Sequence, residues 1–291
     1  MKRVLIIGGS GFLGGHLVAQ AKSRFQVVTT YFEHEYRSGG VEWEFADLTK
    51  IDTIESVINR IKPQIIIHSA ALSNIDECEN KKEFASLINY KATEELAVIS
   101  FKNNIRFIFV SSDMVYDGEK GNYIETDEVN PINFYGDTKV MAEKKIREIC
   151  TNYVIARAAL IYGTSLTQSR SFSDKILHNI NNRQHTNLFY DQFRTPILVD
   201  NLAEALIELC ELPFTGTLNL GGSEIISRYD FGVAMADIYN FPAMLLKRYS
   251  MNDFAFKAKR PRDVSFNIAK AQNLLSTKFV DCKEGLKISC T

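Results

Sequence analysis

Two tyrosine–lysine pairs have a spacing that suits proton transfer. Tyr135 precedes Lys139 by four residues, and Tyr116 precedes Lys120 by the same interval. The free pKa of a tyrosine is about 10, so a phenol that gives up its proton needs a nearby cation to stabilise the phenolate. A lysine one helical turn further along lies on the same face and supplies that cation. The spacing therefore predicts a proton donor, provided that the pair lies on a helix.

The neighbouring residues distinguish the two pairs. Tyr116 begins the segment YDGEKG, whose Asp-Gly step and second glycine predict a turn. Tyr135 follows an Asn-Pro dipeptide that is typical of a helix start, and the helix-forming segment VMAEKKIREIC comes after it. We therefore expect Tyr135 and Lys139 to be catalytic, with Gly136 as a minor weakness in their helix, and Tyr116 to lie in a turn.

A hydroxyl group that could hold a substrate carbonyl follows the strand expected at Ile105–Ser111. Ser112 comes directly after this strand and Asp113 is the next residue. Ligands bind outside the carboxyl ends of the strands in open α/β sheets, which favours Ser112 as the third catalytic residue. Asp113 either binds substrate, or tunes the proton supply, or forms a turn.

A glycine loop follows the first expected strand. Gly8, Gly11 and Gly14 form G-x-x-G-x-x-G between that strand and a helix. Such glycines allow a sharp turn and a close approach of the backbone to a pyrophosphate, which the helix N-terminus then attracts. A glycine-rich turn without a ligand is the alternative. The position in an alternating chain favours dinucleotide binding, and no Gly-Lys-Ser/Thr follows that would indicate a phosphate-binding loop.

The choice of nicotinamide cofactor depends on the end of the second strand. Tyr31 occupies the place where NAD-binding proteins usually carry an acidic residue, and Glu33 lies two residues later. This favours NADP(H), with NAD(H) as the alternative. Arg37 could contact a 2′-phosphate or could be a solvated loop residue. Asp47 could bond an adenine amino group or belong to the N-cap region of the next helix, and the two roles are compatible.

The order of elements predicts the fold class. Strands are expected at Arg3–Ile7, Gln26–Tyr31, Gln64–His68, Ile105–Ser111 and Tyr153–Arg157, and they alternate with helices at Phe12–Ser23, Ile51–Ile61, Glu83–Asn103 and Asn133–Thr151. This alternation indicates an α/β fold with a doubly wound parallel sheet of Rossmann type.

The second half of the chain is less regular. We expect strands at Leu188–Tyr190, Pro196–Val199 and Gly216–Leu220, and helices at Asp200–Glu211 and Ser227–Tyr239, with Asp200 and Ser227 as N-caps. We interpret residues 1–160 as a dinucleotide-binding domain. Residues 161–291 would form mainly a smaller substrate-binding lobe that is interleaved with it, since some segments return to the sheet.

The composition excludes several classes of protein. A net charge of −1 over 291 residues, with scattered basic residues, gives no basis for nucleic-acid binding. The five cysteines are far apart and no histidine lies near them at metal-ligand spacing, so we expect no metal site and a reducing, cytoplasmic location. The N-terminal apolar run is too short for a signal peptide or a membrane span. A homodimer is compatible with the sequence.

Several motifs occur in an order that resembles a known family. They are GGSGFLGGHL, HSAA at 68–71, IDECE at 75–79, Asn89 of LINYKAT, SSDMVYDG, PINFYGDTK, IARAALIYG, RTP at 194–196, SRYDF at 227–231 and KRPRDVSFN at 259–267. The chain thereby resembles the extended short-chain dehydrogenase/reductases, and within them the dTDP-4-dehydrorhamnose reductase group, over nearly its whole length. In that group the reaction serves dTDP-rhamnose and cell-surface polysaccharide biosynthesis.

The resemblance implies a role for individual residues. Gly11, Phe12 and Leu13 would contact the pyrophosphate, Asp47 and Leu48 the adenine, and Ala70, Ala71 and Leu72 the nicotinamide side. Ser112, Tyr135 and Lys139 would be the catalytic triad, and Lys139 would also hold the nicotinamide ribose. The substrate would be a nucleotide-linked 4-keto-6-deoxy sugar, with Arg194 and Arg260 as partners of its diphosphate.

One departure from the family pattern and two rival functions accompany this resemblance. Met114 follows Ser112-Asp113 where the family often has tyrosine, which puts the identity of the sugar in doubt. An epimerase or dehydratase shares the fold and the tyrosine–lysine pair, although a dehydratase usually has a glutamate after Asp113. A non-catalytic NADP-binding protein, like the regulatory subunit of methionine adenosyltransferase, resembles the same group.

Overall fold

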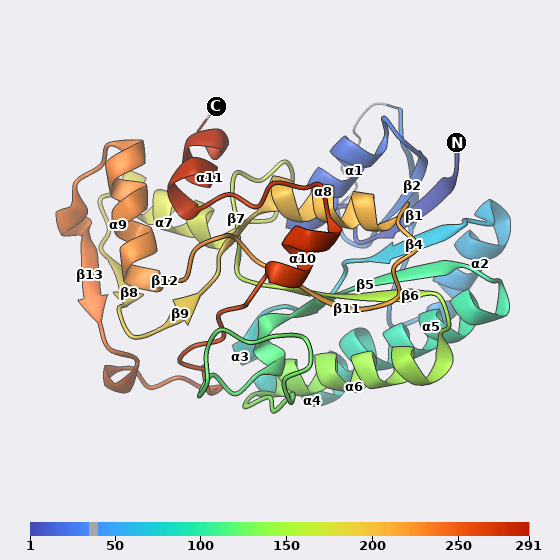
Figure 1. Cartoon of the computed structure of the whole chain (residues 1–291), viewed down its shortest axis with the longest axis horizontal. Helices are drawn as coiled ribbons and strands as arrows, with labels where there is room; N and C mark the ends of the chain where they lie inside the picture. The colour runs from blue at the N-terminus through green and yellow to red at the C-terminus, as the bar shows by residue number, and fades with distance from the viewer. Residues whose placement is uncertain (35–39, 291) are drawn as a thin grey trace.

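The fold is built on a parallel seven-stranded sheet with the order β11-β6-β5-β4-β1-β2-β3 (Figure 1). The computed structural model describes residues 1–34 and 40–290. The strands are β1 Arg3–Ile7, β2 Gln26–Tyr31, β3 Glu42–Phe45, β4 Ile65–His68, β5 Arg106–Ser112, β6 Tyr153–Ala158 and β11 Gly216–Leu220. The order changes direction between β1 and β4, where a doubly wound sheet opens a crevice for ligands. The expected fold class is confirmed.

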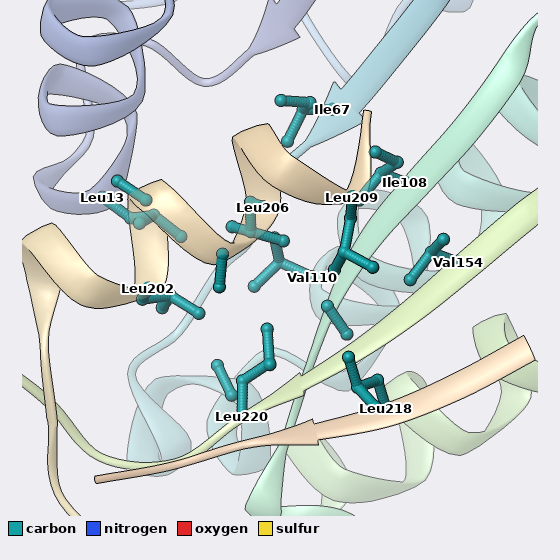
Figure 2. Close-up of a cluster of buried hydrophobic side chains, with 14 of the residues drawn as sticks. Leu13, Ile67, Ile108, Val110, Val154, Leu202, Leu206, Leu209, Leu218 and Leu220 are labelled. Atoms are coloured by element: carbon teal, nitrogen blue, oxygen red, sulfur yellow. The ribbon is translucent and has the colours of Figure 1, made fainter. Parts of the chain in front are cut away.

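Helices cover both faces of the sheet, because the strand side chains that point to each face are apolar. Helices α1 Phe12–Ala21 and α8 Val199–Leu209 cover one face, with Ile6, Ile67 and Ile108 beneath them. Figure 2 shows this layer, in which leucines of α8 point at strands β4, β5, β6 and β11. Helices α2 Ile51–Ile61, α5 Ala92–Lys102 and α6 Phe134–Ile149 cover the other face.

One expected helix is interrupted. The segment expected as a single helix at Glu83–Asn103 consists of α4 Lys82–Ser86, the π-helical turn η1 Leu87–Lys91, and α5. Turns of this kind are rare and are frequently found at functional sites. Asn89 of the π turn is buried, and its amide oxygen accepts a hydrogen bond from the Leu72 N–H at 2.8 Å, while its amide nitrogen donates to the Leu72 carbonyl at 3.0 Å.

A second, smaller core lies in the C-terminal half, to the left of the sheet in Figure 1. Helices α7 Phe172–Asn181, α9 Arg228–Tyr239 and α11 Cys282–Ser289 pack there with the parallel pair β8 Thr186–Phe189 and β13 Leu246–Tyr249. Short pairs connect this region to the sheet: β9 Phe193–Arg194 with β12 Ile226–Ser227, and β7 Ile161–Tyr162 with β10 Ile197–Leu198. Helix α3 Ile75–Asn80 and helix α10 Ala269–Leu274 complete the main elements.

Two expectations for the second half need correction. Asp200 is not an N-cap, because α8 begins at Val199 with Leu198 as the capping residue. Asp200 instead accepts a hydrogen bond from Gln20 at 3.0 Å and lies 2.8 Å from His16 Nδ1, so it fastens α8 to α1. The segment expected as a strand at Pro196–Val199 is shorter, since Val199 already belongs to α8. Ser227 does cap α9, where it accepts from the Asp230 N–H.

Within residues 1–34 and 40–290, no helix has the length and apolar character needed to cross a membrane.

Candidate active site

A cleft of about 920 Å³ opens at the carboxyl ends of β1, β4 and β5. It brings together nearly all of the site residues expected from the sequence. The lining includes Gly8, Gly11, Phe12, Leu13, Gly14, Asp47, Leu48, Ala70, Ala71, Leu72, Ser112, Asp113, Tyr135 and Lys139. Residues far apart in the chain are thus placed along one cavity, with the glycine loop after β1 between the residues that follow β2 and β3 and the tyrosine–lysine pair.

The glycine loop has the close packing that a dinucleotide site requires. Gly8 has a φ of +98°, and a Cβ there would lie 2.8 Å from Ala70. A Cβ on Gly14 would lie 2.0 Å from the Gly8 carbonyl oxygen, so helix α1 approaches the loop as only glycine permits. No side chain caps α1 and no acidic residue lies in its first turn, which leaves its N-terminus suited to a pyrophosphate. These residues fit a nicotinamide dinucleotide.

The far end of the cleft is formed by residues after β2 and β3. Asp47 is buried and its carboxylate accepts hydrogen bonds from the N–H and the hydroxyl of Thr49, at 2.9 and 2.7 Å. Lys50 is the capping residue of α2, so Asp47 stabilises the turn before that helix. Contact of Asp47 with an adenine stays a prediction. Tyr31 and Glu33 also line the cleft, whereas Arg37 lies outside the described residues.

The catalytic candidates come from β5 and α6. Asn133 caps α6 by accepting from the Gly136 N–H at 2.9 Å, so Tyr135 and Lys139 lie one turn apart on a regular helix. Lys139 Nζ lies 5.9 Å from the centre of the Tyr135 ring and 4.4 Å from that of Phe109. The pair is buried but borders the cleft. This arrangement is the one that proton donation by Tyr135 requires.

Close packing explains why position 136 is glycine, which the sequence context did not show. A Cβ on Gly136 would lie 2.2 Å from the Met114 carbonyl oxygen and 2.7 Å from Pro131 Cβ. The short turn after β5, which carries Ser112 and Asp113, therefore packs directly on the first turn of α6. This close approach places Ser112 beside Tyr135, and hydrogen bonding with Ser112 partly opposes the effect of burial on the tyrosine pKa.

Burial shifts the pKa values of both members of the pair. It raises the pKa of Tyr135 well above its usual value, so the phenol stays protonated at neutral pH. Burial lowers the pKa of Lys139 to about 7, and the Glu143 carboxylate opposes this shift. A cation at this position is therefore sensitive to its neighbours.

Glu143 belongs to a buried network that the sequence interpretation missed. Its carboxylate is fully buried and accepts from Arg157 at 2.7 and 3.0 Å, from the Ser111 hydroxyl at 2.6 Å, and from Arg147 at 2.8 Å. The network joins α6, β5 and β6, and Glu143 lies one helical turn after Lys139. A signal was available, because Glu143 follows Tyr135 and Lys139 at further steps of four on the same helix face.

Tyr116 belongs to a buried hydrogen-bond network and not to the cleft. It is fully buried, and its hydroxyl donates to the Ile124 carbonyl at 2.9 Å and accepts from Arg157 at 2.6 Å. Lys120 points elsewhere and pairs with Asp127 at 2.6 Å. The two residues do not share a helix, so this pair lacks the geometry for proton donation.

The two arginines expected at a diphosphate do not line the cleft. Arg194 is only 1% exposed, and its guanidinium donates to the carbonyls of Phe193 and Pro261. Its Nε lies 3.7 Å from Asp113 Oδ2, behind the end of β5. Arg260 pairs with Asp76 at 2.8 Å. Burial raises the pKa of Asp113 and Arg194 opposes the shift, so Arg194 favours the charged carboxylate.

The family described as the RmlD substrate binding domain matches residues 1–290. The chain belongs to this family. It is 28% identical to the dTDP-4-dehydrorhamnose reductase of Aggregatibacter actinomycetemcomitans, over 99% of this chain and 98% of that protein. It is 29% identical to methionine adenosyltransferase 2 subunit beta of Xenopus tropicalis, over 84% of this chain and 75% of that protein.

A solved structure agrees with the whole fold. The crystal structure of dTDP-4-dehydrorhamnose reductase from Bacillus anthracis in complex with NADP superposes with a TM-score of 0.87 at 25% identity, covering 100% of this chain and 99% of that one. The resemblance that the motifs indicated is therefore confirmed at the level of the family.

Proposed function

We propose that this chain is an NAD(P)H-dependent reductase of a nucleotide-linked 4-keto-6-deoxy sugar, with NADP(H) favoured. The observation that carries the proposal is the cleft, which is lined by the glycine loop and also by Ser112, Tyr135 and Lys139. The family and the similarity to dTDP-4-dehydrorhamnose reductases, one of them in complex with NADP, support the same activity.

The chemistry of the site follows from the protonation states of its residues. A bound reduced nicotinamide would supply the hydride, and Gly8, Gly11 and Gly14 would hold its pyrophosphate. Ser112 would donate a hydrogen bond to the sugar carbonyl. Tyr135 would give its proton to the carbonyl oxygen, while the Lys139 cation stabilises the phenolate that remains. The buried Tyr135 is protonated at neutral pH, as a proton donor must be.

The rival functions have less support. A dehydratase is not favoured, since Met114 follows Asp113 in place of an acidic residue. A regulatory role has support in the similarity to methionine adenosyltransferase 2 subunit beta. Substrate-dependent turnover separates a reductase from a regulatory subunit, and net oxidation of the cofactor separates it from an epimerase.

The test is a panel of 4-keto nucleotide sugars with NADPH and with NADH, followed by absorbance of the reduced nicotinamide. We expect oxidation of NADPH that depends on the added sugar. Tyr135→Phe should lower kcat by about 10²-fold or more, the usual size of a proton-transfer contribution. Wild-type turnover in the Tyr135→Phe protein would contradict the catalytic assignment. Absence of turnover with every sugar would favour the regulatory role.

We also propose a cytoplasmic location, which the five free cysteines support because thiols persist in a reducing compartment. The expected homodimer stays a prediction.

A further inference from the structure

A buried histidine lies on the helix that follows the glycine loop. His16, on the second turn of α1, is 4% exposed, and both of its ring nitrogens face hydrogen-bond acceptors. Nδ1 lies 2.8 Å from a carboxylate oxygen of Asp200, and Nε2 lies 3.0 Å from the Thr164 carbonyl oxygen. A neutral imidazole has one N–H and can donate to only one of these acceptors, whereas an imidazolium donates to both. The contacts of His16 are therefore those of a charged ring.

The groups around His16 suit a cation at this position. Asp200 faces it from α8, and the hydrogen bond with His16 holds the pKa of this carboxyl group below its usual range, so Asp200 is a carboxylate at neutral pH. Glu204, one turn further along α8, is exposed. On α1 the neighbours are neutral: Gln20 also donates to Asp200, at 3.0 Å, and the Phe12 ring lies edge-on to His16 with 5.9 Å between the ring centres.

The segment that begins with Thr164 lies against the glycine loop. We call residues 164–170 the strap, and they connect β7 to α7. The Ser169 hydroxyl donates to a backbone carbonyl of the glycine loop at 3.5 Å. A Cβ on Gly15 would lie 2.7 Å from Thr167 Cγ2, so the strap packs directly on the beginning of α1. The strap thus contacts the part of the chain that would hold a pyrophosphate.

The strap also borders the space that a cofactor would occupy. Ser169 and Arg170 line the catalytic cleft together with Gly11, and the strap lines a smaller cavity of about 310 Å³ beside the same glycine. Arg170, the charged residue of the strap, is exposed. The residues that flank the strap are fixed to each other, since the Ser171 hydroxyl donates to the Gly163 carbonyl at 2.9 Å. A dinucleotide bound at Gly11 would therefore lie against the strap, whose contact with α1 then affects how tightly the ligand is held.

Loss of the proton from His16 would reverse one of its two contacts. A histidine ordinarily changes charge between about pH 5 and pH 8. The Asp200 carboxylate is the stronger acceptor, so a neutral ring would keep its one proton on Nδ1. The lone pair of Nε2 would then face the Thr164 carbonyl oxygen, and two acceptors repel each other. The Thr164 hydroxyl would still donate to the Ser289 carbonyl of α11 at 2.8 Å, so the strap would lose its contact with α1 and keep its place in the fold.

We propose that His16 is a latch, which holds the strap on the glycine loop while its imidazole is charged and so couples the affinity for the dinucleotide to pH. The proposal rests on the proposed function, since it takes the ligand of the glycine loop to be NAD(P)H. His16 acts through Thr164 and touches no reacting atom, so it is a positioning residue. The latched strap binds the dinucleotide better, and the affinity therefore falls as the pH rises and the proton leaves His16.

The test is a titration of the whole protein with NADPH from pH 6 to pH 9, read by the fluorescence of the bound nicotinamide. His16→Gln directs a neutral amide N–H at Thr164, a contact that needs no ionisation. We expect the affinity of the wild type to fall by about 10-fold over this range relative to that of His16→Gln, the size of a lost contact from a charged group. The comparison cancels the titration of Lys139, whose pKa is about 7, and of the NADPH phosphate, because both proteins share these groups.

Two other variants complete the comparison. Gln20→Met is the matched control, because Gln20 lies one turn after His16 on α1 and donates to the same Asp200 carboxylate rather than to the strap. It should keep the pH dependence of the wild type and bind NADPH within about twofold of it. His16→Phe keeps a ring but has no donor, and it should bind NADPH about 10-fold more weakly than the wild type at pH 6.

Two measurements on the free wild-type protein need neither a variant that folds well nor a bound cofactor. In protein with nitrogen-15-labelled histidine, the His16 ring should carry protons on both nitrogens at pH 6 and on one nitrogen at pH 9. Hydrogen exchange of the strap amides, corrected for the intrinsic effect of pH, should become about 10-fold less protected over the same range. A role of His16 in packing alone would change neither quantity.

The outcomes separate the latch from the proposed function. A wild-type affinity that keeps a constant ratio to that of His16→Gln from pH 6 to pH 9, or a His16 ring that is already neutral at pH 6, would overturn the latch while turnover of a keto sugar still stands. A strap that loosens as His16 loses its proton, in a protein that binds neither NADPH nor NADH, would uphold the latch and overturn the reductase. A neutral ring in a protein without nicotinamide binding would overturn both.

Discussion

Replacement of Glu143 by glutamine tests how the buried network supports Tyr135 and Lys139, the proposed catalytic pair. Glutamine keeps the shape of the side chain but removes a charge that is fully buried against Arg157, itself 2% exposed. Removing one partner of such a pair costs about 3–5 kcal/mol, because the other charge stays buried and unpaired. Arg157 still donates to the Tyr116 hydroxyl at 2.6 Å, so we expect about 3 kcal/mol, the lower end of that range.

The pH dependence of this loss has a definite sign. Arg157 holds the pKa of Glu143 below its ordinary value of 4.5 even though burial acts in the opposite direction. A carboxyl group with a lowered pKa in the folded state stabilises the protein above its unfolded pKa, and this contribution disappears as the pH falls through the folded pKa. The difference in unfolding free energy between the wild type and Glu143→Gln should therefore be full at pH 7 and shrink below about pH 4.5.

The same substitution acts on Lys139. Glu143 opposes the effect of burial on the Lys139 pKa, which lies at about 7. Without this carboxylate the pKa of Lys139 should fall further, and the alkaline decline of kcat/KM should move to lower pH.

Urea unfolding at pH 7 and pH 4, together with a pH–rate profile, measures these effects. Glu148→Gln on the same helix is the control, since Glu148 forms only a half-exposed pair with Lys145 and should change stability by less than about 1 kcal/mol. A Glu143→Gln protein as stable as Glu148→Gln at pH 7, with an unshifted profile, would refute this account of the network.

Two further predictions concern Tyr116, which lies outside the cleft, and Lys139. Tyr116→Phe should leave kcat near that of the wild type but lower the unfolding free energy by about 1 kcal/mol in urea, because Arg157 loses an acceptor; a large fall in kcat with unchanged stability would contradict it. In the wild type, kcat/KM for reduction should decline as the pH rises through the Lys139 pKa of about 7, since the cation is lost while Tyr135 stays protonated. A profile measured from pH 6 to pH 9 at saturating NADPH that stays flat would count against this role of Lys139.

Much of the fold could be predicted because the strands of the first half are apolar on both faces and helices separate them. The edge strand β3 Glu42–Phe45 was missed, since its sequence EWEF alternates charged and aromatic residues at a half-exposed edge. The π-helical turn was also missed, because helix-forming residues continue through it without a break. Aspartate often caps helices, which favoured Asp200 as an N-cap. Its contact with His16 arises where α8 packs on α1, and the order of residues in the sequence does not show this packing.

The candidate site was predictable where local pattern and position in the sheet agree. The glycine loop, Ser112 and the Tyr135–Lys139 pair satisfy both conditions, and the structure gathers them in one cleft. Arg194 was expected at the site because a guanidinium suits a diphosphate. Its burial depends on how β9 and the segment at Pro261 pack, which the sequence does not show.

The π-helical turn has a consequence for how this chain can change in evolution. A π-helical turn equals an α-helix with one residue inserted, so every side chain after it is offset by about 100° from the direction it would have in an uninterrupted α-helix. Ala85, before the turn, packs near Tyr135, whereas Leu96 and Ala97, after it, pack on the sheet. Point substitutions cannot exchange these two faces. A change in length by one residue would be needed, and it would displace the Asn89 amide that holds Leu72 at the same time.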